Sequence, residues 1–255
     1  MLAETHLFPC LKDNYGVLLH DPATGATAAI DAPDAQSVEA ALKQKRWRLT
    51  DILVTHHHAD HTQGIPALKQ HHGCRVVAPS SEANRIPFVD EMVGDSDMVM
   101  VGDLMARVIE TPGHTAGHVS YWVRGSKLAF VGDTLFSIGC GRIIEGDAQV
   151  MWSSLLKLRE LPDDAKVYCG HEYTRSNIRF AMTIEKDNQA LAQRSAEVNQ
   201  LMAKGQPSIP MIMGVEKAAN PFLRADLAQV AHAVGLPGAP AWKVFAEIRA
   251  RKDRF

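Results

Sequence analysis

Thr55-His56-His57-His58-Ala59-Asp60-His61 is the stretch of this sequence in which possible metal ligands are most concentrated. Neutral imidazole and carboxylate groups both bind zinc, iron and manganese in proteins. The run Asp51–Val54, apolar after its first residue, precedes the stretch, and a helix-forming segment at 62–69 follows it. The pattern predicts a strand, a ligand-bearing loop and a helix, an arrangement in which a rigid scaffold holds catalytic groups.

Three further ligand-type residues each follow a strand or a tight turn. His114 comes after the turn Pro112-Gly113, and Asp133 comes after the apolar strand expected at 127–131 and a glycine. His171 follows the strand expected at 166–169 and another glycine. The pattern of a strand or turn followed by a metal-type ligand therefore occurs four times along the chain. Parallel strands that end at one edge of a sheet would bring the four groups together.

Composition and charge narrow the class of protein. The 255 residues, 46% of them hydrophobic, suit one large domain or one large and one small domain. A net charge of −2 argues against a general affinity for nucleic acid or anionic membrane. The N-terminus lacks a signal-peptide pattern, and no apolar run approaches the roughly 18 residues that span a bilayer. We expect a cytoplasmic protein whose cysteines are free thiols in a reducing compartment, namely Cys10, Cys74, Cys140 and Cys169.

The chain changes character after about residue 173. Before it, strand and helix signals alternate, with a hairpin at 17–31 and an irregular acidic stretch at 80–104, which indicates a layered α/β sandwich. After it, helical patterns dominate, and an extended connector is expected at 206–211. We therefore predict a catalytic domain at 1–172 and a small all-α domain at 173–255. The helical stretches expected in the second domain are 176–204, 225–234 and 240–252.

The ligand pattern resembles that of the metallo-β-lactamase-fold hydrolases, whose signature is His-x-His-x-Asp-His. The resemblance implies a four-layer αββα sandwich with a binuclear metal centre. One metal would be held by His56, His58 and His114, and the other by Asp60, His61 and His171. Asp133 would bridge both ions. Zinc is the expected metal, and iron and manganese suit the same donors.

The chemistry of this donor set fits a hydrolase. Carboxylates at 60 and 133 offset the positive charge that imidazoles alone would leave uncompensated. The resemblance implies a metal-bridging hydroxide, held by Asp133 and the ligand set, because two metals about 3.5–4 Å apart lower the pKa of a shared water from ~15.7 towards neutrality. The metals would also polarise the substrate carbonyl and stabilise the oxyanion that forms.

Other candidate residues are assigned weaker roles. His57 should point away from the ligands on either side of it, and His118 is expected in packing or in a hydrogen bond to a ligand. Asp31 and Cys140 are open between a supporting role and none. The histidines expected to be structural or solvated are His6, His20, His71, His72 and His232.

A narrower resemblance, to the glyoxalase II family of hydroxyacylglutathione hydrolases, covers nearly the whole chain. It is carried by residues 130–136, 139–142, 170–174, 220–224 and the closing Arg-x-x-Lys-Asp-x-Phe of 249–255. It implies hydrolysis of S-D-lactoylglutathione to D-lactate and glutathione, the reaction that completes methylglyoxal detoxification. It also implies substrate contacts at Arg142, Tyr173, Arg249 and Lys252. Ile144 departs from the family, which has an aromatic residue there.

Alternatives remain at this point. The basic end of the chain, where five cationic residues in 241–255 oppose two acidic ones, suits an anionic glutathione, but also suits a solvated helix end. Another thioester or lactone hydrolase of the same fold is the nearest rival. Two alternatives belong to other functional classes. One is a persulfide dioxygenase that uses one iron, and the other is a non-catalytic metal-binding protein. We expect a monomer, since no long exposed apolar stripe stands out.

Overall fold

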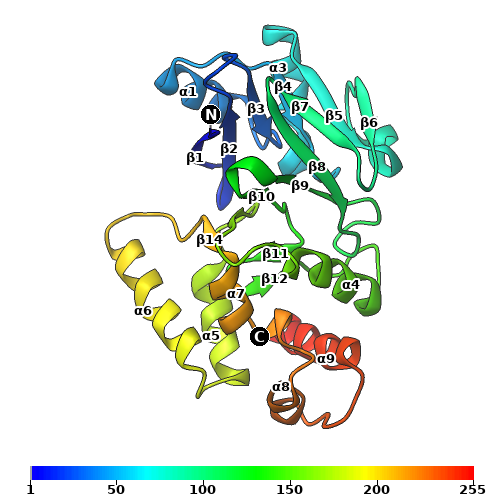
Figure 1. Ribbon diagram of the computed structural model, residues 1–255, viewed down its shortest axis with the longest axis vertical. Helices are drawn as coiled ribbons and strands as arrows, with labels where there is room; N and C mark the ends of the chain where they lie inside the picture. The colour runs from blue at the N-terminus through cyan, green and yellow to red at the C-terminus, as the bar shows by residue number, and fades with distance from the viewer. Residues whose placement is uncertain (1) are drawn as a thin grey trace. The chain divides into compact units, whose positions relative to one another are not determined.

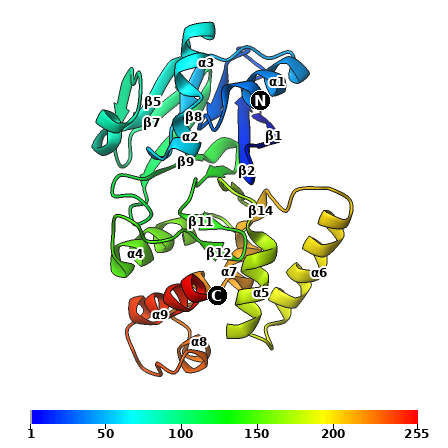
Figure 2. The ribbon, with the colours of Figure 1, turned by 180° about the vertical axis from the view of Figure 1, so that it is seen from behind.

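The computed structural model describes residues 2–255, which separate into two compact units by their internal contacts (Figures 1 and 2). Unit 1 consists of the residues up to Glu110 together with Thr115–Gly132. Unit 2 consists of Thr111–His114 and Asp133–Phe255. No helix within residues 2–255 combines the length and the apolar character needed to cross a membrane.

The first sheet of unit 1 contains the strand that leads into the histidine-rich stretch. Its order is β1-β2-β3-β4-β5-β6, with antiparallel pairing from β1 to β3 and parallel pairing from β3 to β6. The predicted hairpin at 17–31 is confirmed, because Val17 pairs with Ile30 and His20 with Thr27. The strands are β1 (Glu4–Cys10), β2 (Asn14–His20), β3 (Thr27–Ile30), β4 (Asp51–Leu53), β5 (Arg75–Pro79) and β6 (Glu91–Val93).

Helices α1 (Ala35–Lys45) and α3 (Ile65–His72) pack on one face of this sheet. Alternate residues of a strand point to the same face, and Ile52 and Val76 share a buried cluster with Leu42 of α1 and Leu68 of α3. The Asp34 side chain accepts a hydrogen bond from the Ser37 backbone N–H (2.7 Å) and so caps α1. The short helix α2 (Ala59–Thr62) lies in the histidine-rich stretch itself.

A second set of strands in unit 1 is antiparallel and follows the order β10-β9-β8-β7. The buried Tyr121 hydroxyl on β9 donates to the Val54 carbonyl just after β4 (2.7 Å), which ties the two strand sets together. These strands are β7 (Met98–Val101), β8 (Leu104–Glu110), β9 (Val119–Val123) and β10 (Leu128–Phe130).

The prediction of an irregular stretch at 80–104 was wrong. This stretch contains β6, β7 and a 3₁₀ helix at Ser80–Arg85. In β7, Val99 and Val101 are buried while Met98 and Met100 are exposed, which is the period-two pattern of a half-buried strand. The sequence did not predict this strand because its alternating pattern covers only four positions and acidic turn residues flank it.

Unit 2 begins with a small hairpin and continues mainly as helices. The hairpin consists of β11 (Leu135–Phe136) and β12 (Gly139–Cys140), and a second pair of strands consists of β13 (Lys166–Tyr168) and β14 (Met211–Ile212). Asp147 caps the first helix by accepting from the backbone N–H groups of Gln149 and Val150. The helices are α4 (Ala148–Arg159), α5 (Thr174–Ile184), α6 (Gln189–Ala203), α7 (Met213–Ala219), α8 (Ala228–Ala233) and α9 (Ala241–Arg254), with a 3₁₀ helix at Pro221–Leu223.

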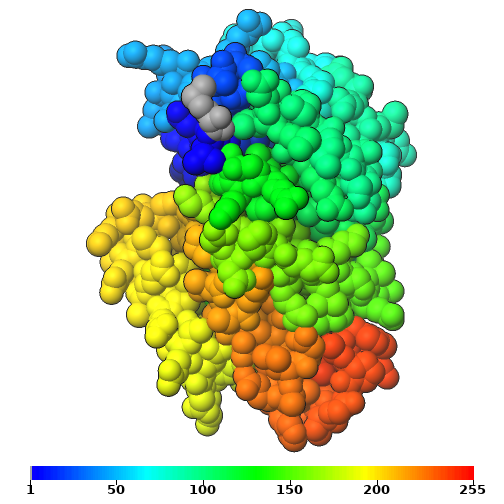
Figure 3. Space-filling view, in the orientation of Figure 1, coloured from blue at the N-terminus to red at the C-terminus, as the bar shows by residue number. Residues whose placement is uncertain are grey.

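The predicted helical stretch at 176–204 is two helices, α5 and α6, which lie side by side (Figures 1 and 2). Glu185 ends α5 in a non-helical conformation, and the Asn188 side chain starts α6 by accepting from the Leu191 N–H. Their facing residues Ile178, Leu191 and Val198 form a buried cluster. The opposite side of α6 lies at the surface of unit 2, drawn yellow in Figure 3. The sequence did not predict α7, which follows the expected extended connector.

Candidate metal centre

The imidazole groups of the histidine-rich stretch converge within unit 1. The chain leaves β4 at Leu53 and enters α2 at Ala59, so the ligand candidates lie on a short loop and the first turn of a helix. His56 Nε2 and His58 Nδ1 are 3.1 Å apart. Ligand atoms of a tetrahedral site with metal–nitrogen bonds of 2.0–2.1 Å lie about 3.3 Å apart, so this pair suits a shared cation.

Hydrogen bonds fix which ring nitrogen of His61 and of His56 carries the proton. His61 Nδ1 lies 2.8 Å from Asp31 Oδ2, and a carboxylate can only accept, so Nδ1 carries the hydrogen and Nε2 is the unprotonated atom. Thr55 donates its hydroxyl hydrogen to Asp31, so its Oγ accepts from His56 Nδ1 (3.0 Å). Both rings therefore present Nε2 as the ligand atom.

Asp31 is the common anchor of this network. Its carboxylate also accepts from the Thr55 backbone N–H (2.7 Å), and the residue is 4% exposed. Its φ of 59° places it in the left-handed region, which only a few residue types adopt readily. Sequence analysis left Asp31 open between a supporting role and none, and the structure places it in direct contact with His61.

Asp60, like His58, is a partly exposed donor of the stretch. Its Oδ2 lies 3.8 Å from His61 Nε2 and accepts a hydrogen bond from Asn14 Nδ2 (3.1 Å). Asn14 is buried at the start of β2 and also donates to the Asp60 backbone carbonyl (3.1 Å). Sequence reasoning missed Asn14, because the partner lies 46 residues away and an isolated asparagine carries no signal.

His57 and His118 are occupied in other contacts. His57 Nδ1 lies 2.7 Å from Glu82 Oε2, and the second oxygen of that carboxylate accepts from the Gly117 N–H (2.8 Å). The buried His118 ring stacks on His56 with ring centroids 5.0 Å apart. Glu82, which is 2% exposed, was also missed from the sequence.

A second group of donors converges within unit 2. Asp133 Oδ2 lies 3.3 Å from His171 Nε2 and 3.6 Å from His114 Nε2, and all three residues are buried. His114 Nδ1 lies 2.9 Å from the Arg142 carbonyl oxygen, which can only accept, so Nδ1 carries the proton. The lone pair of Nε2 therefore lies near a carboxylate oxygen. A divalent cation stabilises such an arrangement of buried lone pairs.

The turn that follows Asp133 is held by buried polar groups of the C-terminal segment. Ile138 has a φ of 55°, which is strained for a β-branched residue. Glu216 of α7 accepts from the Ile138 N–H (2.8 Å) and from Ser137 Oγ (3.2 Å), and Asn220 donates to the Gly139 carbonyl (3.0 Å). Burial raises the pKa of Glu216 to about 7. This network supports the backbone next to Asp133.

Gly141 provides a test of the geometry around Asp133. A Cβ at this position would overlap the Asp133 carbonyl oxygen and would lie 3.3 Å from His114 Nδ1. We expect Gly141→Ala to lower the free energy of unfolding by about 1–3 kcal/mol and to reduce bound metal, because backbone and ring must both move. Chemical denaturation and elemental analysis measure the two effects. Gly125→Ala is the control, since no atom lies within 4 Å of its added Cβ, and equal metal loss in both variants would contradict the expectation.

The basic residues and Tyr173 lie beside this second donor group. The Tyr173 ring stacks on His171 with ring centroids 4.9 Å apart. Lys252 Nζ donates to the Ser176 hydroxyl (3.0 Å), and burial, together with the charges of Arg249, Arg179 and Arg142, lowers the Lys252 pKa to about 8. Arg249 is buried and donates to the Cys140 carbonyl (2.9 Å) and to Asp253 (2.9 Å).

Two family models match adjoining parts of the chain, from residue 11 to residue 255. The model of the metallo-β-lactamase superfamily matches residues 11–171, and that of the hydroxyacylglutathione hydrolase C-terminus matches residues 172–255. A hydroxyacylglutathione hydrolase of Rhodopseudomonas palustris (strain BisA53) is 58% identical over 254 residues and covers 100% of both chains. One from Nitrobacter winogradskyi is 57% identical with the same coverage. The chain belongs to the hydroxyacylglutathione hydrolase family.

Solved structures support the fold of this hydroxyacylglutathione hydrolase family member. The crystal structure of ETHE1 from Myxococcus xanthus has a TM-score of 0.67 at 27% identity, and the match covers 99% of this chain and 98% of that chain. The BLEG-1 B3 metallo-β-lactamase has a TM-score of 0.65 at 20% identity, covering 86% and 99%, and shows the shared fold alone. The predicted α/β metallo-β-lactamase fold with a C-terminal helical part is confirmed, and its His/Asp clusters indicate a divalent metal centre.

The thiols of this hydroxyacylglutathione hydrolase family member are not activated nucleophiles. Burial raises the pKa of Cys10 to about 12 and that of Cys140 to about 11. The four cysteines are free thiols, as the sequence predicted, and all four are buried. Cys140 contributes its backbone carbonyl to Arg249, and its sulfur lies 3.9 Å from the same guanidinium. Thiolate chemistry therefore has no candidate among these residues.

Proposed function

We propose that the chain hydrolyses S-D-lactoylglutathione to D-lactate and glutathione. The observation that carries this proposal is the full-length similarity to relatives named hydroxyacylglutathione hydrolase, which includes the C-terminal segment as well as the histidine-rich domain. A hydroxyacylglutathione is a thioester, so the activity is thioester hydrolysis. The thiol that leaves has a pKa near ~8.5 in simple models, and the reaction needs no strong general acid.

The metal ligands in this proposal are the seven residues of the family pattern. His56, His58 and His114 would hold one ion, Asp60, His61 and His171 would hold the other, and Asp133 would be shared between them. The proximity of Asp133 Oδ2 to one imidazole from each set, His114 and His171, supports the bridging role. Two zinc ions, or iron or manganese in their place, would supply an activated water and stabilise charge on the carbonyl oxygen.

The side chains around the ligands orient them and bind the substrate. Asp31 holds His61 directly and His56 through Thr55, so that each ring presents Nε2. The anionic glutathione moiety is bound by Arg142, Tyr173, Arg249 and Lys252. The carboxylate-binding role of Lys252 is supported by the cluster of guanidinium groups around it.

We propose that the chain consists of a catalytic domain at 1–172 and a helical substrate-binding domain at 173–255. The two family models meet between residues 171 and 172, which supports this boundary. The contact-based units divide the chain differently, because Asp133 and the residues after it pack with the C-terminal helices. We also propose that the protein acts as a cytoplasmic monomer with no nucleic-acid or membrane partner, which light scattering and cell fractionation would test.

Lys252 makes substrate binding pH-dependent in this proposal. Its lowered pKa of about 8 means that the ammonium loses its proton between pH 7 and 9, whereas an exposed lysine would stay charged. We expect KM for the glutathione thioester to rise across this range while kcat changes less. Lys252→Arg keeps its charge and should give a flat KM profile. Equal KM profiles for the two proteins, corrected for spontaneous thioester hydrolysis, would argue against the contact.

A single set of assays tests the activity. Steady-state rates are compared for S-D-lactoylglutathione, a lactone and a β-lactam, with elemental analysis of the same sample and a measurement of oxygen consumption with a glutathione persulfide. We expect the steady-state rate with the thioester to exceed the rates with the lactone and the β-lactam by orders of magnitude. We also expect elemental analysis to find about two divalent ions per chain. A preference for the lactone, or oxygen consumption with one iron per chain, would reject the proposal.

A further inference from the structure

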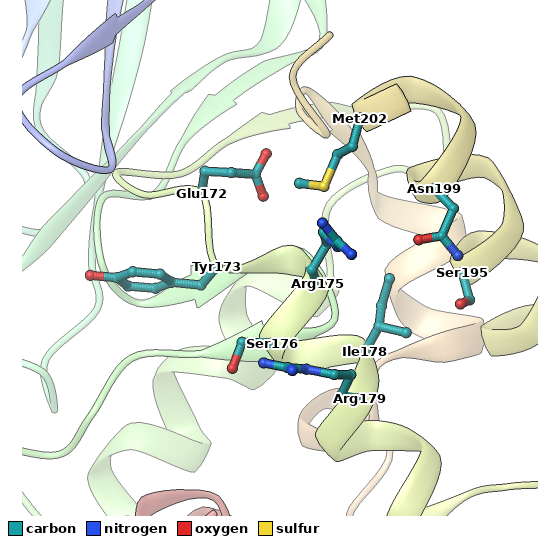
Figure 4. A pocket seen from close by; sticks show the side chains of 9 residues that line it. All are labelled: Glu172, Tyr173, Arg175, Ser176, Ile178, Arg179, Ser195, Asn199 and Met202. Carbon is teal, nitrogen blue, oxygen red and sulfur yellow. The ribbon is translucent and has the colours of Figure 1, made fainter. Parts of the chain in front are cut away.

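A pocket of about 540 Å³ opens between α5 and α6 in unit 2 (Figure 4). Its size is within the range of small-ligand pockets. Arg175 and Arg179 of α5 line one side, and Ser195 and Asn199 of α6 line the other. The Glu172 carboxylate borders the same space as the Arg175 guanidinium. The lining therefore carries charges of both signs, alongside the apolar side chains of Ile178 and Met202.

The two arginines give the pocket an excess of positive charge. They are four residues apart on α5 and so project from the same side of the helix. Both are exposed, and within residues 2–255 neither forms an ion pair with an acidic side chain. Glu172 is held in place by hydrogen bonds from the Ser208 N–H (3.1 Å), the Ser208 hydroxyl (2.9 Å) and the Thr174 N–H (3.1 Å).

The pocket adjoins the residues that the proposed function assigns to substrate binding. Tyr173 and Ser176 line it, and Ser176 is also the residue to which Lys252 Nζ donates. Arg179 lines the pocket and is close enough to Lys252 to lower its pKa. Lys252 and the pocket therefore have Ser176 as a common neighbour.

We propose that this pocket binds the γ-glutamyl end of the glutathione moiety, with Arg175 and Arg179 on its α-carboxylate and Glu172 on its α-ammonium. The assignment rests on the proposed thioester-hydrolase function. The two ends of glutathione differ in charge: the glycine end is a carboxylate only, whereas the γ-glutamyl end is a zwitterion. The all-cationic surroundings of Lys252 suit the glycine end, and the mixed charges of the pocket suit the other. Ser176 contacts Lys252 and also lines the pocket, and an extended tripeptide spans about 10 Å, so we assign both ends to one glutathione molecule.

Truncating the substrate tests the assignment. The substrates are S-D-lactoylglutathione and S-D-lactoyl-N-acetylcysteinylglycine, in which an acetyl group replaces the γ-glutamyl group and the glycine carboxylate is kept. The acetyl group blocks the cysteine amine, which would otherwise capture the lactoyl group from sulfur. Arg175→Ala is the decisive variant, because Arg179 also lies near Lys252. We expect it to lower kcat/KM for the full thioester about tenfold, mainly through KM, since it removes a charged hydrogen bond. Activity on the truncated thioester should stay within about twofold of the wild-type value.

The control is Arg48→Ala, which removes one positive charge from an exposed position of unit 1 and should change neither rate. Equal losses on both substrates with Arg175→Ala, or no loss on either, would overturn the γ-glutamyl assignment. Failure of the wild-type protein to hydrolyse either thioester would instead overturn the proposed function, and the assignment with it. Thermal melting of Arg175→Ala should match the wild type, because the side chain is exposed.

Discussion

Asp133→Ala is expected to lose bound metal and to lower kcat/KM by roughly 10³-fold or more. In the proposed centre both ions share this carboxylate, so its removal takes a ligand from each and leaves their mutual repulsion without a compensating anion. The Nε2 atoms of His114 and His171 lie 3.6 and 3.3 Å from its Oδ2. Elemental analysis after gel filtration, together with steady-state kinetics on the thioester, measures the two effects.

Two comparisons separate this role from a general loss of structure. Asp133→Asn keeps the size of the side chain but not its charge, and should also lose metal. Asp187→Ala removes an exposed carboxylate of unit 2 and should retain metal and activity. If Asp133→Ala kept two tightly bound ions per chain, the bridging assignment would have to be abandoned.

Asp31→Asn is expected to reduce metal affinity by about 10- to 100-fold although residue 31 is not itself a proposed ligand. Asparagine tolerates the positive φ of this position, so the backbone strain does not increase. Its amide can donate to His61 Nδ1, which would move the ring proton to Nε2, the proposed ligand atom. The charge-assisted bond from Thr55 is weakened at the same time.

Asp21→Asn is a matched control in the same unit. Asp21 is also buried and accepts three hydrogen bonds, from the Ala23 N–H, the Asp103 N–H and the Thr24 hydroxyl. Both variants should lower the free energy of unfolding, whereas only Asp31→Asn should weaken metal binding, measured by competition with a chromophoric chelator. Unchanged metal affinity in Asp31→Asn would show that the carboxylate does not orient His61.

The local parts of the site could be predicted from the sequence because their signals are contiguous. The histidine-rich stretch follows the short apolar strand β4, and both features fall within eleven residues, 51–61. The groups that orient the ligands could not be predicted in the same way. Asp31 and Glu82 lie 30 and 25 residues from the histidines that they contact. A single buried carboxylate has no sequence pattern of its own, and only the folded chain reveals its partners.

The fold shows the same limit. The hairpin at 17–31 was predictable, because turn residues mark its bend. The break between α5 and α6 was not, since residues 185–188 contain no glycine or proline and only Asn188 signals a new helix start. The pocket between α5 and α6 could not be predicted from the sequence for a related reason. It depends on how two helices pack, and the periodicity along one helix does not specify that packing.

The turn after Asp133 has a consequence for protein engineering. Its backbone is held by Glu216 and Asn220, and Arg249 bonds the adjacent Cys140 carbonyl. Residues 173–255 therefore cannot be exchanged for the same segment of a relative without regard to the turn at 137–140. A chimera that takes this segment from a relative with another thiol preference must preserve these three contacts to the 137–140 turn. Where they are mismatched, we expect the chimera to lose the backbone support next to Asp133 before any new preference can be measured.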